Sequence, residues 1–205
     1  MSISTEQVIA NANTAVIDYE SASLQPDAGL LSFGGFKFNR FSVEETKLAM
    51  EIPDLNFYVN LDLTEQFFLG FDIDKATGKW WRERNASQIA EVLKNPTSIS
   101  KSLPEFFKWL MSNKPIVFCR RTHADYVWTN NACKLLKIKN PIGYNEILDV
   151  PTAIFQATGE IKGYIKTGME FANHNALGDC QRDGLQLAFI TDPNAKLTTE
   201  QIIER

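Results

Sequence analysis

The chain has 205 residues, of which 44% are hydrophobic and 22% are charged, a composition typical of a single globular domain. No apolar run approaches the roughly 20 residues that a membrane-spanning helix needs, and the polar start MSISTEQVIANANT lacks the basic and apolar regions of a signal peptide. Three widely spaced cysteines offer neither a disulfide framework nor a C-x-x-C pair, so we expect reduced, buried thiols in a cytoplasmic protein. With a net charge of -4, the protein surface as a whole is not suited to nucleic-acid binding, so any such binding must be confined to a local patch.

Strand patterns dominate the first third of the chain. Three strands are expected there: TAVID (14–18), GLLSFGGFKFNRF (29–41) and NFYVNLDL (56–63). Gly34 and Gly35 indicate a bulge or a bend in the second strand. The turn PDAG (26–29) predicts that the first two strands form a hairpin, and residues 1–13 ahead of them form a loose arm or a short helix.

Helical patterns alternate with short strands in the rest of the chain. Helices are expected at NASQIAEVLKN (85–95), SLPEFFKWLMSN (102–113), ADYVWTNNACKLLK (124–137) and NALGDCQRDGLQLAFI (175–190). Short strands are expected at PIVFC (115–119) and NEILDV (145–150). In the second helix Ser102 is the candidate N-cap and Pro104 lies in the first turn. Three strands followed by alternating helices and strands predict an α/β fold whose mixed sheet carries helices on its faces.

The first strand ends in two carboxylates, Asp18 and Glu20. Both share one side-chain parity in an extended chain, so both can face one point at the strand end where α/β proteins bind ligands. Clustered carboxylates repel each other, and a hard divalent cation such as Mg²⁺ or Mn²⁺ relieves the repulsion. Because D-x-E is a common spacing, a solvated turn explains this pair more simply when it is taken alone.

Two later stretches add candidate groups. In HNALGDC, His174 precedes Asp179 by five residues as the chain enters a helix, which lets the histidine lie beside a metal-activated water. In VFCRRTHADYVW, Asp125 opens a helix directly after a strand. Each residue alone has a simpler explanation, a surface histidine for His174 and a helix cap for Asp125.

Five residues in chain order carry a resemblance to a known family: Asp18, Glu20, Asp125, His174 and Asp179. They resemble the motifs of DEDDh-type 3′–5′ exonucleases of the ribonuclease H-like superfamily. VIDYESASLQPDAGLLSFGGFKF is similar to the first motif and its hairpin, HNALGDC to the H-x-A-x-x-D motif, and DKATGKWWRERNAS to the T-x-WW segment of a bacterial and phage exoribonuclease and exonuclease group. The resemblance runs from Thr14 to Phe189. It implies a mixed five-stranded sheet of the ribonuclease H-like fold, flanked by helices on both faces.

The resemblance implies a metal-dependent 3′–5′ exonuclease that hydrolyses single-stranded RNA or DNA from its 3′ end and releases 5′-mononucleotides. The implied metal ligands are Asp18, Glu20, Asp125 and Asp179. They would hold two divalent ions, Mg²⁺ or Mn²⁺, with Asp18 shared by both and His174 as the general base. The residue types suit this chemistry, because four carboxylates can hold two ions roughly 3.5–4 Å apart, one beside the attacking water and one beside the leaving 3′ oxygen.

The resemblance also implies contacts with the terminal nucleotide. The residues concerned are Ser21, Ala22 and Leu24 after the first motif, and Trp80, Trp81 and Arg82 in the T-x-WW segment. Two tryptophans beside an arginine can combine base stacking with a phosphate contact, and core packing of one or both rings is the alternative.

Arg120 and Arg121 either add local positive charge or form a solvated loop. Asp149 either touches the site or caps the helix that starts at Pro151, which stands where the close group carries an arginine.

Two other functions stay open, a non-catalytic nucleic-acid-binding protein of the same fold and a phosphoesterase acting on dinucleotides or small nucleotides. Four mutually repelling acids argue against the first. The sequence does not distinguish an RNA substrate from a DNA substrate, because the contact with the 2′-hydroxyl is a geometric detail.

We expect one domain over 1–205, with an arm over 1–13, a catalytic core over 14–190 and a tail over 191–205. A homodimer is expected by analogy only, and the expected location is the cytoplasm, that of the host if a phage encodes the chain.

Overall fold

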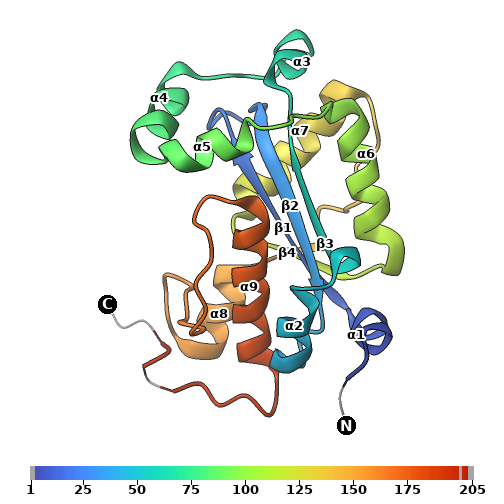
Figure 1. The fold of residues 1–205 in the computed structure, drawn as a ribbon, viewed down its shortest axis with the longest axis vertical. Coiled ribbons are helices and arrows are strands. Elements are labelled where there is room, and N and C mark those ends of the chain that lie inside the picture. The colour runs from blue at the N-terminus through green and yellow to red at the C-terminus, as the bar shows by residue number, and fades with distance from the viewer. Residues whose placement is uncertain (1–2, 199, 203–205) are drawn as a thin grey trace.

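Five strands form one sheet in the order β3-β2-β1-β4-β5 in the computed structural model, which describes residues 3–198 and 200–202 (Figure 1). The strands are β1 (Thr14–Ser21), β2 (Leu30–Phe38), β3 (Asn56–Asn60), β4 (Ile116–Cys119) and β5 (Ile147–Asp149). β1, β2 and β3 pair antiparallel, whereas β4 runs parallel to β1 and β5 runs parallel to β4. The predicted mixed five-stranded sheet and the β1–β2 hairpin are therefore confirmed.

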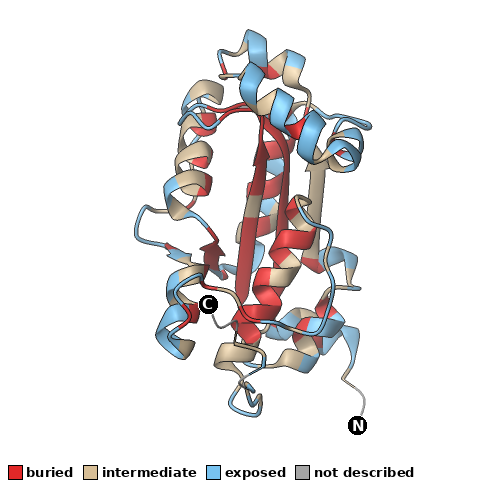
Figure 2. Cartoon of the chain, turned by 90° about the vertical axis from the view of Figure 1, so that its left-hand side faces the viewer, coloured by how far each residue is buried: buried red, intermediate tan, exposed pale blue. Residues whose placement is uncertain are grey.

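Helices cover both faces of this sheet, as predicted (Figures 1 and 2). The helices of the described residues are α1 (Thr5–Asn11), α2 (Val43–Ala49), α3 (Leu63–Phe68), α4 (Lys75–Arg84), α5 (Ala86–Val92), α6 (Ile99–Leu110), α7 (Val127–Leu136), α8 (Val150–Thr158) and α9 (Ala176–Thr191). α6 and α7 pack on one face, and α1, α2, α8 and α9 pack on the other. α4 and α5 lie beyond the carboxyl end of β1, where Trp81 and Val92 form a small separate cluster. No helix in the described ranges is both long and apolar enough to cross a lipid bilayer.

The side chains of β1 alternate between the two faces. Ile17 and Tyr19 enter the core beneath α6 and α7, and Val16 enters the core beneath α8 and α9. Because side chains alternate along a strand, Asp18 and Glu20 lie on the α9 side. β1 and β2 are buried almost throughout (Figure 2), so both carboxylates project from a rigid, desolvated strand.

Gly34 and Gly35 do not form the predicted bulge or bend, because both lie in regular register with β1. A Cβ atom at Gly34 would lie 2.6 Å from the backbone of Ala176 at the start of α9. A Cβ atom at Gly35 would lie 2.6 Å from the ring of Trp109 in α6. The two glycines therefore allow α9 and α6 to approach β2 closely, and the first contact brings the start of α9 against the sheet.

α6 begins one turn earlier than predicted, with Ser98 rather than Ser102 as its N-cap residue. Its first turn is held by the carboxylate of Glu65 in α3, which accepts hydrogen bonds from the hydroxyls of Ser98 (2.9 Å) and Ser100 (2.6 Å). Pro104 consequently lies inside the helix and not in its first turn. A cap supplied by a residue 33 positions away leaves no local pattern in the sequence.

Candidate active site

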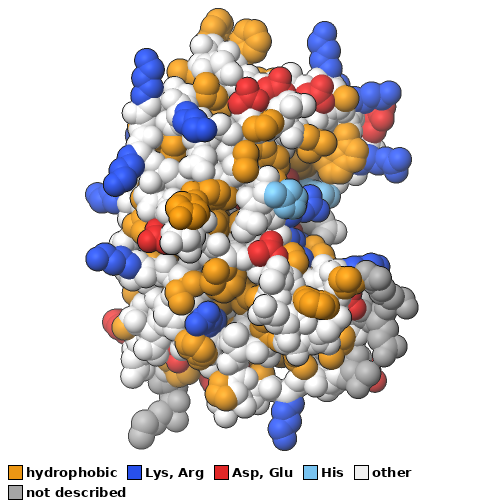
Figure 3. All heavy atoms as spheres, turned by 180° about the vertical axis from the view of Figure 1, so that it is seen from behind, with side chains coloured by type: hydrophobic (Ala, Val, Ile, Leu, Met, Phe, Trp, Pro, Cys, Tyr) orange, Lys and Arg blue, Asp and Glu red, His pale blue; other side chains and the backbone are white. Residues whose placement is uncertain are grey.

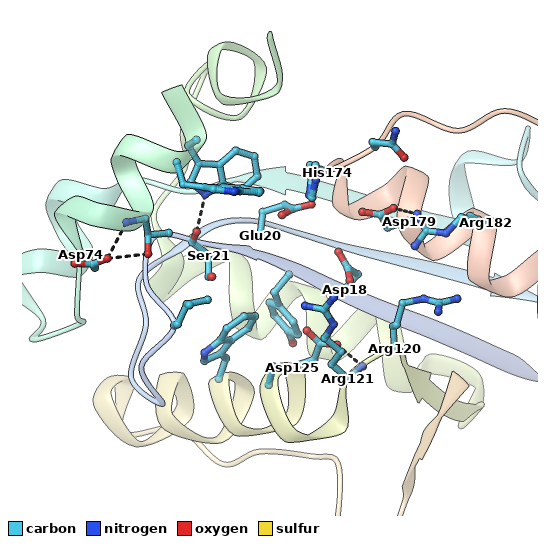
Figure 4. A pocket seen from close by; sticks show the side chains of 18 of the residues that line it. Asp18, Glu20, Ser21, Asp74, Arg120, Arg121, Asp125, His174, Asp179 and Arg182 are labelled. Carbon is cyan, nitrogen blue, oxygen red and sulfur yellow. Dashed lines mark hydrogen bonds and ion pairs between the residues drawn. The ribbon is translucent and has the colours of Figure 1, made fainter. Parts of the chain in front are cut away.

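A cavity of about 680 Å³ opens where β1 and β4 end (Figure 4). Its walls come from segments far apart in the chain: the end of β1, the loop after β4, α4, the start of α7, the segment before α9 and the first turns of α9. In the view from behind, histidine side chains lie at the waist of the molecule close to acidic and basic groups (Figure 3). The cavity thus lies at the carboxyl end of β1, where the sequence predicted a site.

Four carboxylates lie at the base of the cavity. Asp18 and Glu20 come from β1 and Asp179 from the first turn of α9, and one carboxylate oxygen of each lies within 4.8 Å of the others. Asp125 approaches Asp18 from the other side of the group (Figure 4), out of a single π-helical turn between β4 and α7. Its carboxylate accepts a hydrogen bond from the backbone N–H of Arg121 at 3.2 Å. All four acids suggested by the sequence thus meet at one place.

Burial makes this group electrostatically unfavourable by itself. It raises the pKa of Asp18 well above its usual range, and the nearby carboxylates of Asp125 and Glu20 raise it further. Burial, together with Asp179 and Asp125, raises the pKa of Glu20 to about 8. Burial also raises the pKa of Asp125 to about 7. A cluster of carboxylate oxygens that is costly to ionise is a donor set that fits hard divalent cations.

His174 lines the cavity just before α9, with a φ of 54°, in the left-handed region that non-glycine residues rarely adopt. Its ring lies almost perpendicular to the rings of Trp80 and Trp81, with centroid distances of 5.3 and 5.8 Å. Trp80 is 43% exposed, whereas Trp81 is 2% exposed and donates a hydrogen bond from Nε1 to the backbone oxygen of Ser21 at 2.9 Å. Of the two interpretations of the Trp80–Trp81 pair, core packing therefore holds for Trp81.

The other expected nucleotide contacts are divided between the cavity and its surroundings. Ser21 and Leu24 line the cavity, and Leu24 is 82% exposed. Ala22 is buried in the cluster around Trp81, and Arg82 is exposed on α4; neither is among the described residues that line the cavity. Trp128, which the sequence analysis did not single out, lines the cavity from α7 and donates from Nε1 to the backbone oxygen of Gln25 at 2.9 Å.

Arg120 does not lie in a solvated loop. It is buried and donates to both carboxylate oxygens of Asp183, at 2.8 Å from Nε and 2.8 Å from Nη2. It also donates to the side chain of Gln186 and to the backbone oxygen of Gly163, and its guanidinium lies 3.8 Å from the centroid of the Tyr164 ring. The guanidinium therefore joins the end of β4 to α9 and to the segment that precedes it.

Arg182 is a second cavity residue that the sequence analysis missed. Its guanidinium pairs with Asp179, and its Nε donates to Asp183 at 3.1 Å. The spacing of Asp179 and Arg182, three residues apart on a predicted helix, was the signal that could have identified the pair.

Arg121, by contrast with Arg120, is exposed at the cavity wall. Asp149 accepts a hydrogen bond from the backbone N–H of Thr152 at 2.8 Å and is the N-cap of α8. Of its two predicted roles, the helix cap is therefore the one that the structure shows.

The sheet order and the acids gathered at the end of β1 define a class, the DEDDh nucleases of the ribonuclease H-like fold. A family model for the 3′-5′ exoribonuclease Rv2179c-like domain matches residues 13–190, so the chain belongs to this family. It is a DEDDh-type 3′–5′ exonuclease, as the sequence motifs predicted.

Solved structures share the fold at low sequence identity. The nuclease domain of 3′hExo, a DEDDh family member bound to rAMP, is similar with a TM-score of 0.56 and 12% identity over 86% of this chain and 89% of that one. Cell-death related nuclease 4 (CRN-4) is similar with a TM-score of 0.55 and 13% identity over 85% of this chain and 62% of that one. None of the curated proteins compared with the chain matches it.

Proposed function

We propose that this exonuclease removes 5′-mononucleotides from the 3′ end of single-stranded nucleic acid, with the help of two divalent metal ions. The observation that carries the proposal is the convergence of four carboxylates and one histidine on a single cavity. The family description supports RNA as the first substrate to test, with DNA of the same sequence as the comparison.

Asp18, Glu20, Asp125 and Asp179 would hold Mg²⁺ or Mn²⁺. The raised pKa values of Asp18 and Glu20 support this assignment, because a bound cation stabilises the ionised forms that burial disfavours. Carboxylate oxygens are also the donors that these hard cations prefer. When bound, such ions supply charge stabilisation for the attacking and leaving oxygens of an in-line phosphoryl displacement.

His174 is proposed as the general base. Its imidazole would accept the proton of the water whose oxygen attacks the terminal phosphorus, and would later release that proton to solvent. The bond from phosphorus to the 3′ oxygen breaks, and this oxygen takes up a proton to become the new 3′-hydroxyl end. The position of His174 on the cavity wall, half-exposed and close to Asp179, supports this role.

The terminal nucleotide is proposed to lie between two apolar walls of the cavity. Trp80 of α4 offers an exposed indole on one side, and Leu24 and Trp128 line the other side. Stacking on an aromatic face is tolerant of sequence, and a single strand leaves the base free to stack. Arg121, exposed at the cavity wall, is the candidate contact for a backbone phosphate.

The test is cleavage of 5′-labelled single-stranded RNA and DNA with Mn²⁺ or Mg²⁺, with and without EDTA. We expect a ladder that shortens from the 3′ end and disappears in EDTA. Asp18→Asn should abolish cleavage, and His174→Ala should slow it by about 10²–10⁴-fold, the usual contribution of a general base. Intact oligonucleotides in the presence of metal would contradict the proposal, and cleavage of dinucleotides alone would favour the small-nucleotide phosphoesterase instead.

A further inference from the structure

We propose that Trp81 is a positioning residue that holds the imidazole of His174, whereas Trp80 beside it is free to contact substrate. The inference rests on the proposed role of His174 as the general base. It separates two adjacent tryptophans into different tasks.

The indole of Trp81 is fixed to the strand that carries the acids. It is 2% exposed, and its Nε1 donates to the backbone oxygen of Ser21, the residue after Glu20 in β1. A second hydrogen bond, from the backbone N–H of Asp74 to the oxygen of Ala22 at 2.9 Å, attaches the start of α4 to the same strand end. The Trp81 ring is therefore held in a defined place relative to β1.

His174 needs such a support. Its left-handed backbone conformation is unfavourable for a residue with a Cβ atom, so its surroundings must stabilise it. Among the described residues, its imidazole has no hydrogen-bond partner, and its aromatic neighbours are the two indoles. Trp80 and Trp81 lie at 80° to each other, and the imidazole packs against both at 88° and 78°. Perpendicular aromatic contacts restrict how the imidazole ring can turn.

The two tryptophans differ in what they can reach. Trp80 is 43% exposed and presents a surface on which a nucleobase can stack, but Trp81 is covered and has its only donor engaged. Substitution of Trp80 should therefore raise KM, and because its ring also packs against the imidazole of His174 it should lower kcat as well. Substitution of Trp81 should lower kcat and leave KM nearly unchanged, because displacement of a proton acceptor affects the chemical step.

The decisive experiment is a double-mutant cycle with Trp81→Phe and His174→Ala. Phenylalanine keeps an aromatic ring but loses the hydrogen bond to Ser21. We expect Trp81→Phe to lower kcat about tenfold in the wild-type background and less than about twofold in the His174→Ala background, since the residue acts through His174. Trp109→Phe is the matched control. Trp109 lies in α6, across the sheet from the acids, and its Nε1 also donates to a backbone oxygen, that of Asp54, at 2.9 Å. Its replacement should therefore leave kcat unchanged.

A second readout does not depend on catalysis. The chain has two histidines, so a His123→Gln variant leaves the imidazole resonances of His174 alone in the NMR spectrum. Trp81→Phe should shift and broaden these resonances, and Trp109→Phe should not. If Trp81→Phe is unstable, Trp81→Tyr replaces it in both measurements.

The outcomes separate the two ideas. An equal loss of kcat in both backgrounds, a rise in KM alone or unchanged His174 resonances would overturn the positioning role of Trp81. A His174→Ala variant with the wild-type rate would instead refute the proposed general base, while the resonances would still report whether Trp81 orients the ring.

Discussion

Replacement of Arg120 by methionine should destabilise the protein far more than replacement of any surface charge. The Arg120 and Asp183 side chains are 10% and 3% exposed, so the methionine variant leaves the Asp183 carboxylate buried with the single remaining donor of Arg182. Removal of one partner of a buried ion pair typically costs about 3–5 kcal/mol. For a chain of this length that loss lowers Tm by about 6–20 °C.

Two further variants isolate the physical cause. Arg120→Met combined with Asp183→Asn removes both charges, so its cost should fall to about 1–3 kcal/mol, the range for unsatisfied neutral groups. Lys79→Met breaks a pair with Glu83 whose side chains are 68% and 60% exposed, and should change the free energy of unfolding by less than about 1 kcal/mol. Urea denaturation of the metal-free protein measures all three variants. A loss below 1 kcal/mol for Arg120→Met would refute the idea that the buried pair anchors α9 to β4.

Three other changes have defined expectations. Gly34→Ala places a methyl group 2.6 Å from the backbone of Ala176, so it should destabilise the protein by about 1–3 kcal/mol in urea denaturation and slow cleavage as well. In EDTA, the folded pKa values of Glu20 and Asp125, about 8 and 7, exceed their unfolded values, so the stability that these groups contribute at pH 4 should be lost as pH rises to about 8. Mn²⁺ should restore it at pH 8, by about 2.7 kcal/mol at 100 times its Kd, and thermal melts that are independent of pH in EDTA would contradict this. Arg121→Ala should raise KM several-fold at low salt and less at high salt, and an unchanged salt dependence of KM would exclude a phosphate contact.

The sequence predicted the parts of the fold whose cause is local. The apolar run before Asp18 follows from the burial of β1, and the alternation in β3 from Phe57 and Val59, which pack against the core. The start of α9 follows from its local N-cap, Asn175. The motifs also indicated that Asp125 follows β4 closely and that Asp179 lies in the first turn of α9, and the structure has both residues there. The motif residues could be identified because their spacing within each motif is short.

What the sequence did not reveal depends on contacts between distant segments. The start of α6 is fixed by Glu65, the two glycines of β2 by helices that pack against them, and the burial of Arg120 by Asp183 on α9. The division between Trp80 and Trp81 has the same origin, because adjacent helical residues point in different directions and only the packing of α4 on β1 decides which ring is covered. Patterns of period 2 or 3.6 contain no information on such partners.

Charge in the cavity explains how an acidic chain can act on a polyanion. Once ionised, the four carboxylates would repel a phosphate, and two divalent ions would offset their combined charge of four. Arg120 is neutralised by Asp183, but Arg121 has no salt-bridge partner among the described residues and faces the cavity. Metal loading would then change the cavity from one that repels phosphate to one that attracts it. Affinity for the nucleic acid should therefore rise with Mn²⁺ concentration, and by linkage the nucleic acid should tighten metal binding by the same factor. Equal affinity of an oligonucleotide with Mn²⁺ and with EDTA would show that binding depends on contacts away from the acids.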